Sequence, residues 1–310
     1  MLTKQTNAPN GWLAFELNIL RRLRFKSAIL PLAGEPNLGV YLKRWNVKVL
    51  ANDFVRWSHV RNLAEIQNNA ERLSEEDLAV ILEDAYVPGY KLQNPALRNW
   101  FNETDAWWFD NVRRNIEKLP SQGLQAVALS IGMQTGDYVL SFTEETRELR
   151  QPLSNTYKRL ASVFPEPVNN GQNNTCANKT VNLFLAENYG DLMFLRLPPP
   201  HNSSLRNSLG IAAWREEWIQ TNDEFWNDSE SELTGKLGSH VETKFQYLRL
   251  LEETLKTASH IQNWVIDHTE DGFITTQDIA EIIGQTRRVD TVFTKDFSEL
   301  TGTKAVILTA

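Results

Sequence analysis

The chain opens on apolar residues at helical spacing. Four leucines repeat every three or four positions within residues 12–25: Leu13, Leu17, Leu20 and Leu23. This period places them on one face of an amphipathic helix and turns the arginines of the same segment toward solvent. We therefore predict a helix over residues 12–25 that packs its leucine face against a core.

Two short apolar runs follow this predicted helix. Residues 28–32 and 47–51 each have the length and composition of a buried strand, and a helix is predicted between them over residues 40–45. The first strand ends at a turn that contains Gly34, and the second ends at Asp53. Strand, glycine-containing turn, helix, strand and acidic residue form the opening βαβ unit of a nucleotide- or cofactor-binding sheet.

The middle of the chain has a helical pattern. Between residues 57 and 160 apolar residues recur at helical spacing, and Ser74-Glu75-Glu76-Asp77 has the signature of a capping box. Residues 164–178 are rich in Pro, Asn and Gly and are predicted to form a loop. We therefore predict a helical insertion over residues 61–160 between two parts of one α/β core, residues 1–60 and 161–310.

Strand patterns return after the insertion. Residues 191–195 are predicted to be a strand, and the polar, acid-rich residues 203–240 a solvated loop or lid. The later predicted elements alternate between helix and strand: a helix at 243–259, a strand at 261–267, a helix at 275–283, and strands at 289–293 and 304–308. Because the last two strands can pair antiparallel, the sequence predicts an α/β fold whose mainly parallel sheet ends in an antiparallel pair.

The composition excludes several classes of protein. The chain is 41% hydrophobic and 23% charged, which is ordinary for a globular protein, and it has no apolar run long enough to span a bilayer. Met1 to Asn10 is polar and lacks the order of a signal peptide, so we expect a cytoplasmic protein without a membrane partner. Cys176 is the single cysteine and the five histidines lack ligand spacing, so we expect neither a disulfide framework nor a metal site.

Charge is distributed unevenly along the chain. The net charge is −7, but residues 1–62 hold ten Lys or Arg against three acids, a balance of +7 that leaves −14 for the remainder. A basic segment beside an acidic remainder is typical of a strip that faces phosphates. Four of its bases are the predicted DNA contacts: Arg21, Arg22, Arg24 and Lys26. The alternative is a basic face that meets only solvent and acidic neighbours.

Three segments, in this order, resemble the Dam-like class of DNA adenine-N6 methyltransferases. Leu30-Pro31-Leu32-Ala33-Gly34-Glu35-Pro36-Asn37-Leu38-Gly39, with Asn52-Asp53 downstream, is similar to the family's Pro-Phe-Ala-Gly-x-Gly turn and Asn-Asp. Gly190-Asp191-Leu192-Met193-Phe194-Leu195 is similar to the Asp-Leu-Val-Tyr-Leu strand that leads into the catalytic Asp-Pro-Pro-Tyr. Residues 251–283 are similar to the closing helix–strand–helix element. The resemblance implies a Rossmann-like methyltransferase sheet.

The resemblance also implies a chemistry, which the motif positions do not supply. The family binds S-adenosylmethionine and flips the target adenine out of the DNA duplex. An Asp or Asn oxygen and a proline carbonyl then accept hydrogen bonds from the adenine amine, while a tyrosine stacks on the base. The motif positions hold Arg196, Leu197, Pro198 and Pro199, or one residue later Leu197, Pro198, Pro199 and Pro200. Neither register offers a side-chain acceptor or an aromatic ring.

The cofactor-binding residues that the resemblance implies are Leu32, Gly34, Gly39 and Asp53. In the family the glycines let the backbone approach the methionine part of the cofactor, and the acid contacts the ribose hydroxyls. Here Pro36 stands where the second glycine belongs, fixing φ and removing an N–H, and Thr180 corresponds to a later acid. As alternatives, Asp53 is a helix N-cap or turn residue, and residues 198–200 are a rigid end to a strand.

Aromatic residues of the insertion allow two interpretations. Trp107, Trp108 and Phe109 precede Arg113 and Arg114 on a predicted helix, and such a set could stack on bases and hold phosphates. The alternative, which we favour, is that these rings are buried in a core.

Three functions remain open from the sequence. The first, favoured by the joint loss of catalytic and cofactor motifs, is a pseudoenzyme that keeps a methyltransferase fold to bind nucleic acid or a partner protein. The second is an active S-adenosylmethionine-dependent adenine-N6 DNA methyltransferase whose acceptor comes from another residue, such as His201 or Asn202 in a rearranged loop. The third is an interaction module that binds neither cofactor nor DNA.

Overall fold

Seven strands form one mixed sheet in the computed structural model, which describes residues 11–86, 91–270, 272–301 and 303–310. The strands are β1 (Ser27–Leu30), β2 (Lys48–Asn52), β3 (Thr175–Ala177), β4 (Leu192–Arg196), β5 (Asn263–Glu270), β6 (Thr291–Asp296) and β7 (Lys304–Thr309). Their order is β3-β2-β1-β4-β5-β7-β6. The strand β7 is antiparallel to β5 and β6 on its two sides, and the other neighbouring pairs are parallel. The predicted α/β fold with a mainly parallel sheet and an antiparallel C-terminal pair is confirmed.

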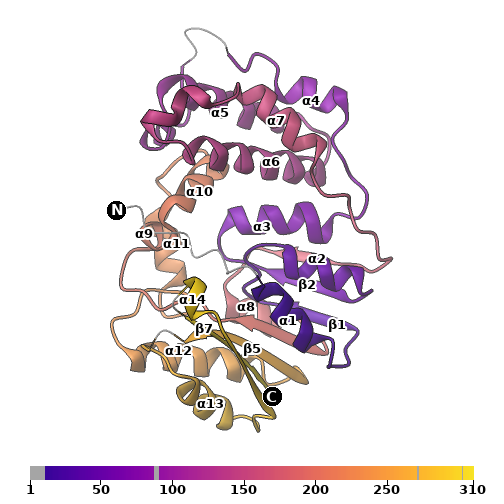
Figure 1. Cartoon of the computed structure of the whole chain (residues 1–310), viewed down its shortest axis with the longest axis vertical. Helices are drawn as coiled ribbons and strands as arrows, with labels where there is room; N and C mark the ends of the chain where they lie inside the picture. The colour runs from indigo at the N-terminus through magenta and orange to yellow at the C-terminus, as the bar shows by residue number, and fades with distance from the viewer. Residues whose placement is uncertain (1–10, 87–90, 271, 302) are drawn as a thin grey trace.

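Helices cover both faces of this sheet (Figure 1). On one face, α1 (Trp12–Leu20) and α2 (Asn37–Arg44) bury Leu20 and Leu42 against β-strand residues such as Phe194. On the other face lie α8 (Val181–Glu187), α12 (Lys244–Thr257) and α13 (Thr276–Gly284). The short helix α14 (Ser298–Thr301) lies between β6 and β7. Each apolar helix stripe therefore has a sheet face to cover, as an α/β fold requires.

Between β2 and β3 the described chain is helical. It forms α3 (Arg56–Asn62), the π-helical turn η1 (Leu63–Gln67), α4 (Glu75–Ile81), the 3₁₀ turn η2 (Pro95–Asn99), α5 (Glu103–Ile116), α6 (Gln122–Leu140), the 3₁₀ turn η3 (Glu144–Leu149) and α7 (Leu153–Ser162). The capping box predicted at Ser74 is present, since Ser74 and Asp77 bond each other's backbone N–H. In Figure 1 the helices α4 to α7 lie at the opposite end of the molecule from the sheet, with α3 and α10 between.

One expected loop contains a strand. Residues 164–178 were expected to lack regular structure, but β3 occupies residues 175–177 and pairs with β2 in parallel. A three-residue edge strand is too short to produce an alternating pattern, so its backbone pairing with β2 defines it rather than its side chains.

The expected solvated loop at residues 203–240 is also wrong. This segment forms α9 (Leu205–Leu209), the 3₁₀ turn η4 (Gly210–Ala212), α10 (Ala213–Gln220) and α11 (Trp226–Leu233). Trp214 and Trp218 of α10 are fully buried in the core of the helical unit, which we define as α3 to α7 together with α10. Its acids suggested solvent exposure, but two of them, Glu216 and Glu217, are buried and accept hydrogen bonds. Because α10 shares that core, the boundaries predicted for the insertion, residues 61–160, stay a prediction.

None of the helices in the described ranges is long and apolar enough to cross a membrane. Met1 to Asn10, on which the expectation of a cytoplasmic protein rests, lie outside the described residues.

Candidate functional site

The strand order reverses between β1 and β4, because the chain moves outward from β1 to β2 and β3 on one side and from β4 to β5 on the other. In open α/β sheets, ligands bind outside the carboxyl ends of the strands at such a point. The loop after β1 carries Gly34, β2 leads into Asp53, and β4 ends at Arg196. The fold thus brings the predicted cofactor and catalytic positions to one edge of the sheet.

Gly34 forms the turn after β1. Its φ of 58° lies in the left-handed region, which favours glycine because it has no Cβ. Its N–H donates to Oδ2 of Asp53 at 2.8 Å, and its carbonyl accepts from Oγ of Ser58 at 2.7 Å. Asn62 donates to the same carbonyl at 3.1 Å. The polar groups of this turn are therefore used by the protein's own side chains.

Asp53 is buried and fully engaged within the protein. Besides Gly34, its carboxylate accepts from the backbone N–H of Val55 at 3.1 Å, and Oγ of Ser58, whose single proton also faces the Gly34 carbonyl, lies 2.8 Å away. Burial raises the pKa of Asp53, and these hydrogen bonds oppose that shift. Both carboxylate oxygens already contact donors of the protein, which is the geometry of the turn aspartate considered as the alternative.

Arg196, at the first position predicted for the catalytic motif, is held by two acids. Its Nη2 and Nε donate to Oε1 of Glu16 at 2.5 and 3.1 Å, and its Nε lies 3.4 Å from Oδ2 of Asp267. Nε1 of Trp12 donates to the same Asp267 oxygen at 3.0 Å. Helix α1, strand β4 and strand β5 therefore meet in one ionic centre, which we define as Trp12, Glu16, Arg196 and Asp267.

The two acids of the ionic centre are closed to water, whereas its arginine is partly exposed. Glu16 is 1% exposed and Asp267 is 0% exposed, whereas the Arg196 side chain is 34% exposed. Burial raises the pKa of Glu16 to about 8, against the pull of Arg196, and the charge of Asp267 adds to the rise. Oε2 of Glu16 and Oδ1 of Asp267 are buried without a hydrogen-bond partner among the described residues. Two acidic side chains here face one cation, and with a pKa of about 8 Glu16 carries a proton at neutral pH.

The residues after Arg196 are also held in place. The N–H of Leu197 donates to the Asp267 carbonyl at 2.8 Å, which extends the β4–β5 pairing. The Pro198 carbonyl accepts from the Tyr247 hydroxyl at 2.9 Å, so this acceptor is already occupied. Pro199 is exposed. These contacts match the alternative of a rigid strand end.

His201 and Asn202 were the residues named as substitute acceptors. The two ring nitrogens of His201 lie 3.0 Å from the Ser203 carbonyl and 3.3 Å from the Gly238 carbonyl. Its own carbonyl accepts from the N–H of Val241 at 2.8 Å. His201 therefore connects two loops in this structure, and the next residue, Asn202, is exposed.

The other two predicted cofactor residues are used for packing. Leu32 is half-buried beside the core formed by α8, α12 and α13. Gly39 lies within α2, where an added Cβ would come within 2.2 Å of Cδ1 of Ile66. Gly39 thus lets η1 approach α2 closely, and this contact explains the glycine without a ligand.

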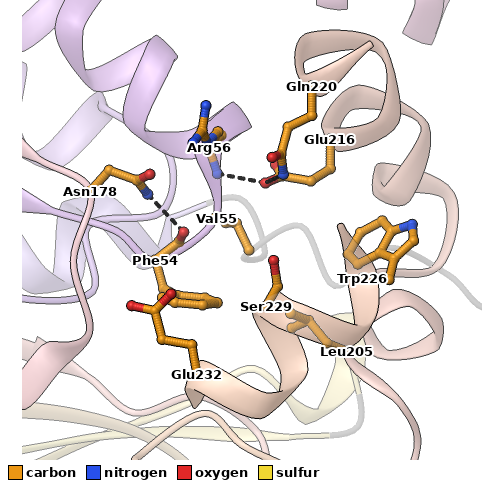
Figure 2. Close-up of a pocket in the computed structure, with 10 residues that line it drawn as sticks. All are labelled: Phe54, Val55, Arg56, Asn178, Leu205, Glu216, Gln220, Trp226, Ser229 and Glu232. Carbon is orange, nitrogen blue, oxygen red and sulfur yellow. Dashed lines mark hydrogen bonds between the residues drawn. The ribbon is translucent and has the colours of Figure 1, made fainter. Parts of the chain in front are cut away.

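A small cavity lies beside Asp53, at the carboxyl ends of β2 and β3 (Figure 2). Its volume is about 100 Å³, below the ~300 Å³ of typical small-molecule pockets. Figure 2 shows Glu216 accepting from the N–H of Arg56, and a second such bond comes from Trp57, both at 2.9 Å. Glu216 therefore closes the start of α3, and burial raises the pKa of Glu216.

The predicted DNA contacts lie at the opposite edge of the sheet. Arg21, Arg22, Arg24 and Lys26 are exposed in the segment between α1 and β1, at the amino ends of the parallel strands. These four residues are close in sequence to the Gly34 turn, but in the fold the length of β1 separates them from the carboxyl edge of the sheet, where Gly34, Asp53 and Arg196 lie.

The aromatic residues of α5 are part of a core. Trp108 and Phe109 are fully buried, and Nε1 of Trp108 donates to Ser154 at 3.0 Å. Trp107 is half-buried against the same core. The interpretation as buried core rings is confirmed for Trp108 and Phe109.

Sequence reasoning missed Glu16 and Asp267. The signal for Glu16 was an acid within the apolar stripe of the first helix, four residues after Trp12. Asp267 carried no signal, because an acid near a strand end is common. Their partner Arg196 is 180 positions from Glu16 along the chain.

No group of three or more His, Cys, Asp or Glu side chains in the described ranges could hold a metal ion. No protein-family model matches this chain, and no curated protein matches it.

Proposed function

We propose that this chain is a methyltransferase-like protein that does not methylate and that acts by binding nucleic acid. The strand order supports the first part of the proposal. Strands β3-β2-β1-β4-β5 follow the order of the first five strands of a dinucleotide-binding sheet, and the reversed β7 agrees with the architecture expected from the resemblance.

The observation that carries the proposal is the pairing of Arg196 with Glu16 and Asp267. Methylation of an adenine amine needs a hydrogen-bond acceptor where Arg196 presents a donor. The nearest carboxylates already accept from Arg196 and Trp12. A guanidinium at this position would also repel the sulfonium of S-adenosylmethionine in a low-dielectric crevice.

The cofactor positions support the same conclusion. The Asp53 carboxylate is buried and holds the Gly34 turn and the start of α3, so it already has a structural role without a ribose. Pro36 cannot donate an N–H to a ligand. The residues present therefore do not fit S-adenosylmethionine, and the proposed function contains no step that uses it.

Two measurements test catalysis and cofactor binding. DNA from a methylase-deficient host that expresses the chain is digested and its N6-methyladenine measured by mass spectrometry, with a host that expresses an active Dam-like enzyme as positive control. We expect no N6-methyladenine above the empty-vector level, and calorimetric titration with S-adenosylmethionine is expected to give no heat of binding. Methylation above background would overturn the proposal in favour of an active enzyme.

The remaining alternative is an interaction module that binds no nucleic acid. The exposed bases Arg21, Arg22, Arg24 and Lys26 favour a polyanionic partner over this alternative. A chain that binds neither DNA nor RNA at low salt would support the interaction module instead.

A further inference from the structure

Six basic residues lie at one edge of the sheet. They come from the α1–β1 segment, the end of α2 and the start of β2. We define them as the amino-edge surface: Arg21, Arg22, Arg24, Lys26, Arg44 and Lys48. The N–H of Lys48 donates to the Lys26 carbonyl at 2.9 Å, so the two segments are in direct contact. Parallel pairing of β1 with β2 brings their amino ends, and hence these bases, together.

The side chains of the amino-edge surface form few charge contacts within the protein. Five of the six are exposed and Lys48 is half-buried, and none has a described carboxylate within 4 Å. Elsewhere exposed basic residues such as Lys118 and Arg249 pair with glutamates. An exposed basic cluster of this kind attracts an anionic partner, even on a chain of net charge −7.

Three of the arginines lie over aromatic rings. The guanidinium carbon of Arg21 lies 5.3 Å from the ring centre of Trp45, that of Arg44 lies 5.2 Å from Tyr41, and that of Arg22 lies 5.4 Å from Phe293. Such cation-π contacts restrict the position of the arginine side chains. A guanidinium group can receive an unpaired nucleobase on its face and a phosphate at its N–H edge.

One acid, Asp191, lies at the same edge. The Asp191 carboxylate accepts from the backbone N–H of Lys26 at 2.7 Å and of Ser27 at 3.0 Å. These bonds, together with the charge of Lys26, lower the pKa of Asp191. Asp191 thus offsets part of one charge of the surface, and the four arginines have no described carboxylate within 4 Å.

We infer that the amino-edge surface binds single-stranded nucleic acid. The phosphates would contact the six basic side chains, and nucleobases would stack on the arginines that lie over aromatic rings. This inference rests on the proposed function for the class of partner, but it concerns the edge of the sheet opposite the Arg196 crevice. An anionic membrane surface would be attracted by charge alone and has no nucleobase to stack on a guanidinium group. A duplex has no unpaired nucleobases for such stacking.

The test is fluorescence anisotropy of the full chain with a labelled 20-nucleotide single strand, in DNA and RNA forms, and with the matching duplex. We expect tighter binding of a single strand than of the duplex. The triple variant Arg21→Glu, Arg22→Glu and Arg24→Glu should weaken single-strand binding at least tenfold. Its plot of log K against log salt should flatten by about 2, since each phosphate contact contributes about 0.7 for a single strand.

Two further variants separate charge from stacking. A control triple variant, Lys118→Glu, Arg249→Glu and Lys256→Glu, makes the same change in net charge at exposed, already paired positions and should bind like the wild type. The variant Arg21→Lys, Arg22→Lys and Arg44→Lys keeps the charge but loses the planes, so it should keep the salt slope and lose about threefold to tenfold in affinity.

Several outcomes would overturn the inference. They are unchanged binding by the charge-reversed variant, equal weakening by the control variant, tighter binding of the duplex, or no binding except to vesicles of anionic lipid. This test is independent of catalysis. N6-methyladenine in the host DNA would overturn the proposed function but not the inference about the amino-edge surface. Unchanged binding by the charge-reversed variant would overturn the inference but not the proposed function.

Discussion

Nη2 of Arg196 donates to Oε1 of Glu16 across 2.5 Å, joining the end of β4 to the helix that precedes β1. The bond lies at the point where a ligand would be expected in an open α/β sheet. Here the cation and its two acids interact with one another instead of with a ligand. The ionic centre is therefore a structural element, and its removal should lower the free energy of unfolding.

Replacement of Arg196 by methionine should destabilise the protein. The change leaves Asp267 fully buried and Glu16 nearly so, without their cation, and removing one member of a buried ion pair costs about 3–5 kcal/mol. The free energy of unfolding, measured by urea titration at pH 8, should fall by that amount. The double variant Arg196→Met with Glu16→Gln should recover part of the loss. A loss below about 1 kcal/mol would show that the pairing contributes little.

Stability should depend on pH through Glu16. Its pKa is raised to about 8 in the folded protein from an ordinary value of 4.5, so between these values the folded state holds a proton that the unfolded state has released. The free energy of unfolding should therefore fall as the pH rises from 5 to 8, by at most about 1.4 kcal/mol per pH unit. Glu16→Gln should flatten this fall in urea titrations, whereas Glu144→Gln, at an exposed position, should leave it unchanged. Equal slopes in all three proteins would contradict the assignment.

Gly39→Ala should destabilise the protein through packing. The new methyl group would come within 2.2 Å of Cδ1 of Ile66, and overpacking of this kind costs about 1–3 kcal/mol. Thermal and urea unfolding measure the loss, and Ile66→Val should relieve part of it in the double variant. Gly284→Ala is the matched control, since it also lies in a helix but its added Cβ meets no atom within 4 Å. The control should be neutral or stabilise by up to about 1 kcal/mol.

Glu217→Gln should loosen the junction between the helical unit and α11. The buried Glu217 carboxylate accepts from Nε1 of Trp100 at 2.6 Å, Nε1 of Trp226 at 3.0 Å and Nε of Arg206 at 2.7 Å. A glutamine offers only one acceptor oxygen, so a buried donor loses its partner at a cost of about 1–3 kcal/mol. Urea unfolding followed by tryptophan emission measures the loss. Glu224→Gln, on the surface, should change stability by less than about 0.5 kcal/mol; an equal effect of both changes would rule out this role of Glu217.

The sequence by itself determined many of the local elements and the mainly parallel sheet with its antiparallel C-terminal pair. Leucines at helical spacing predicted α1, and short apolar runs predicted β1, β2 and β4 within a few residues of their observed bounds. Each of these signals depends on residues a few positions apart, because local periodicity sets which face an element buries. That Arg196 offers no hydrogen-bond acceptor could also be inferred from the sequence, since it depends only on the residue type.

Only the tertiary structure decided which charges meet. Glu16, Arg196 and Asp267 are far apart in the sequence and come together because α1 packs over the strands β4 and β5. The basic N-terminal segment likewise does not form one surface: Lys43 is buried, and Arg61 pairs with Glu35.

The same holds for the acidic segment around α10. Its acids predicted a solvated loop, yet Glu216 and Glu217 are buried because backbone and indole N–H groups from other elements satisfy them. A charge pattern records how many charges the chain carries, but the cost of burying each charge depends on partners that only the folded chain brings within hydrogen-bonding distance.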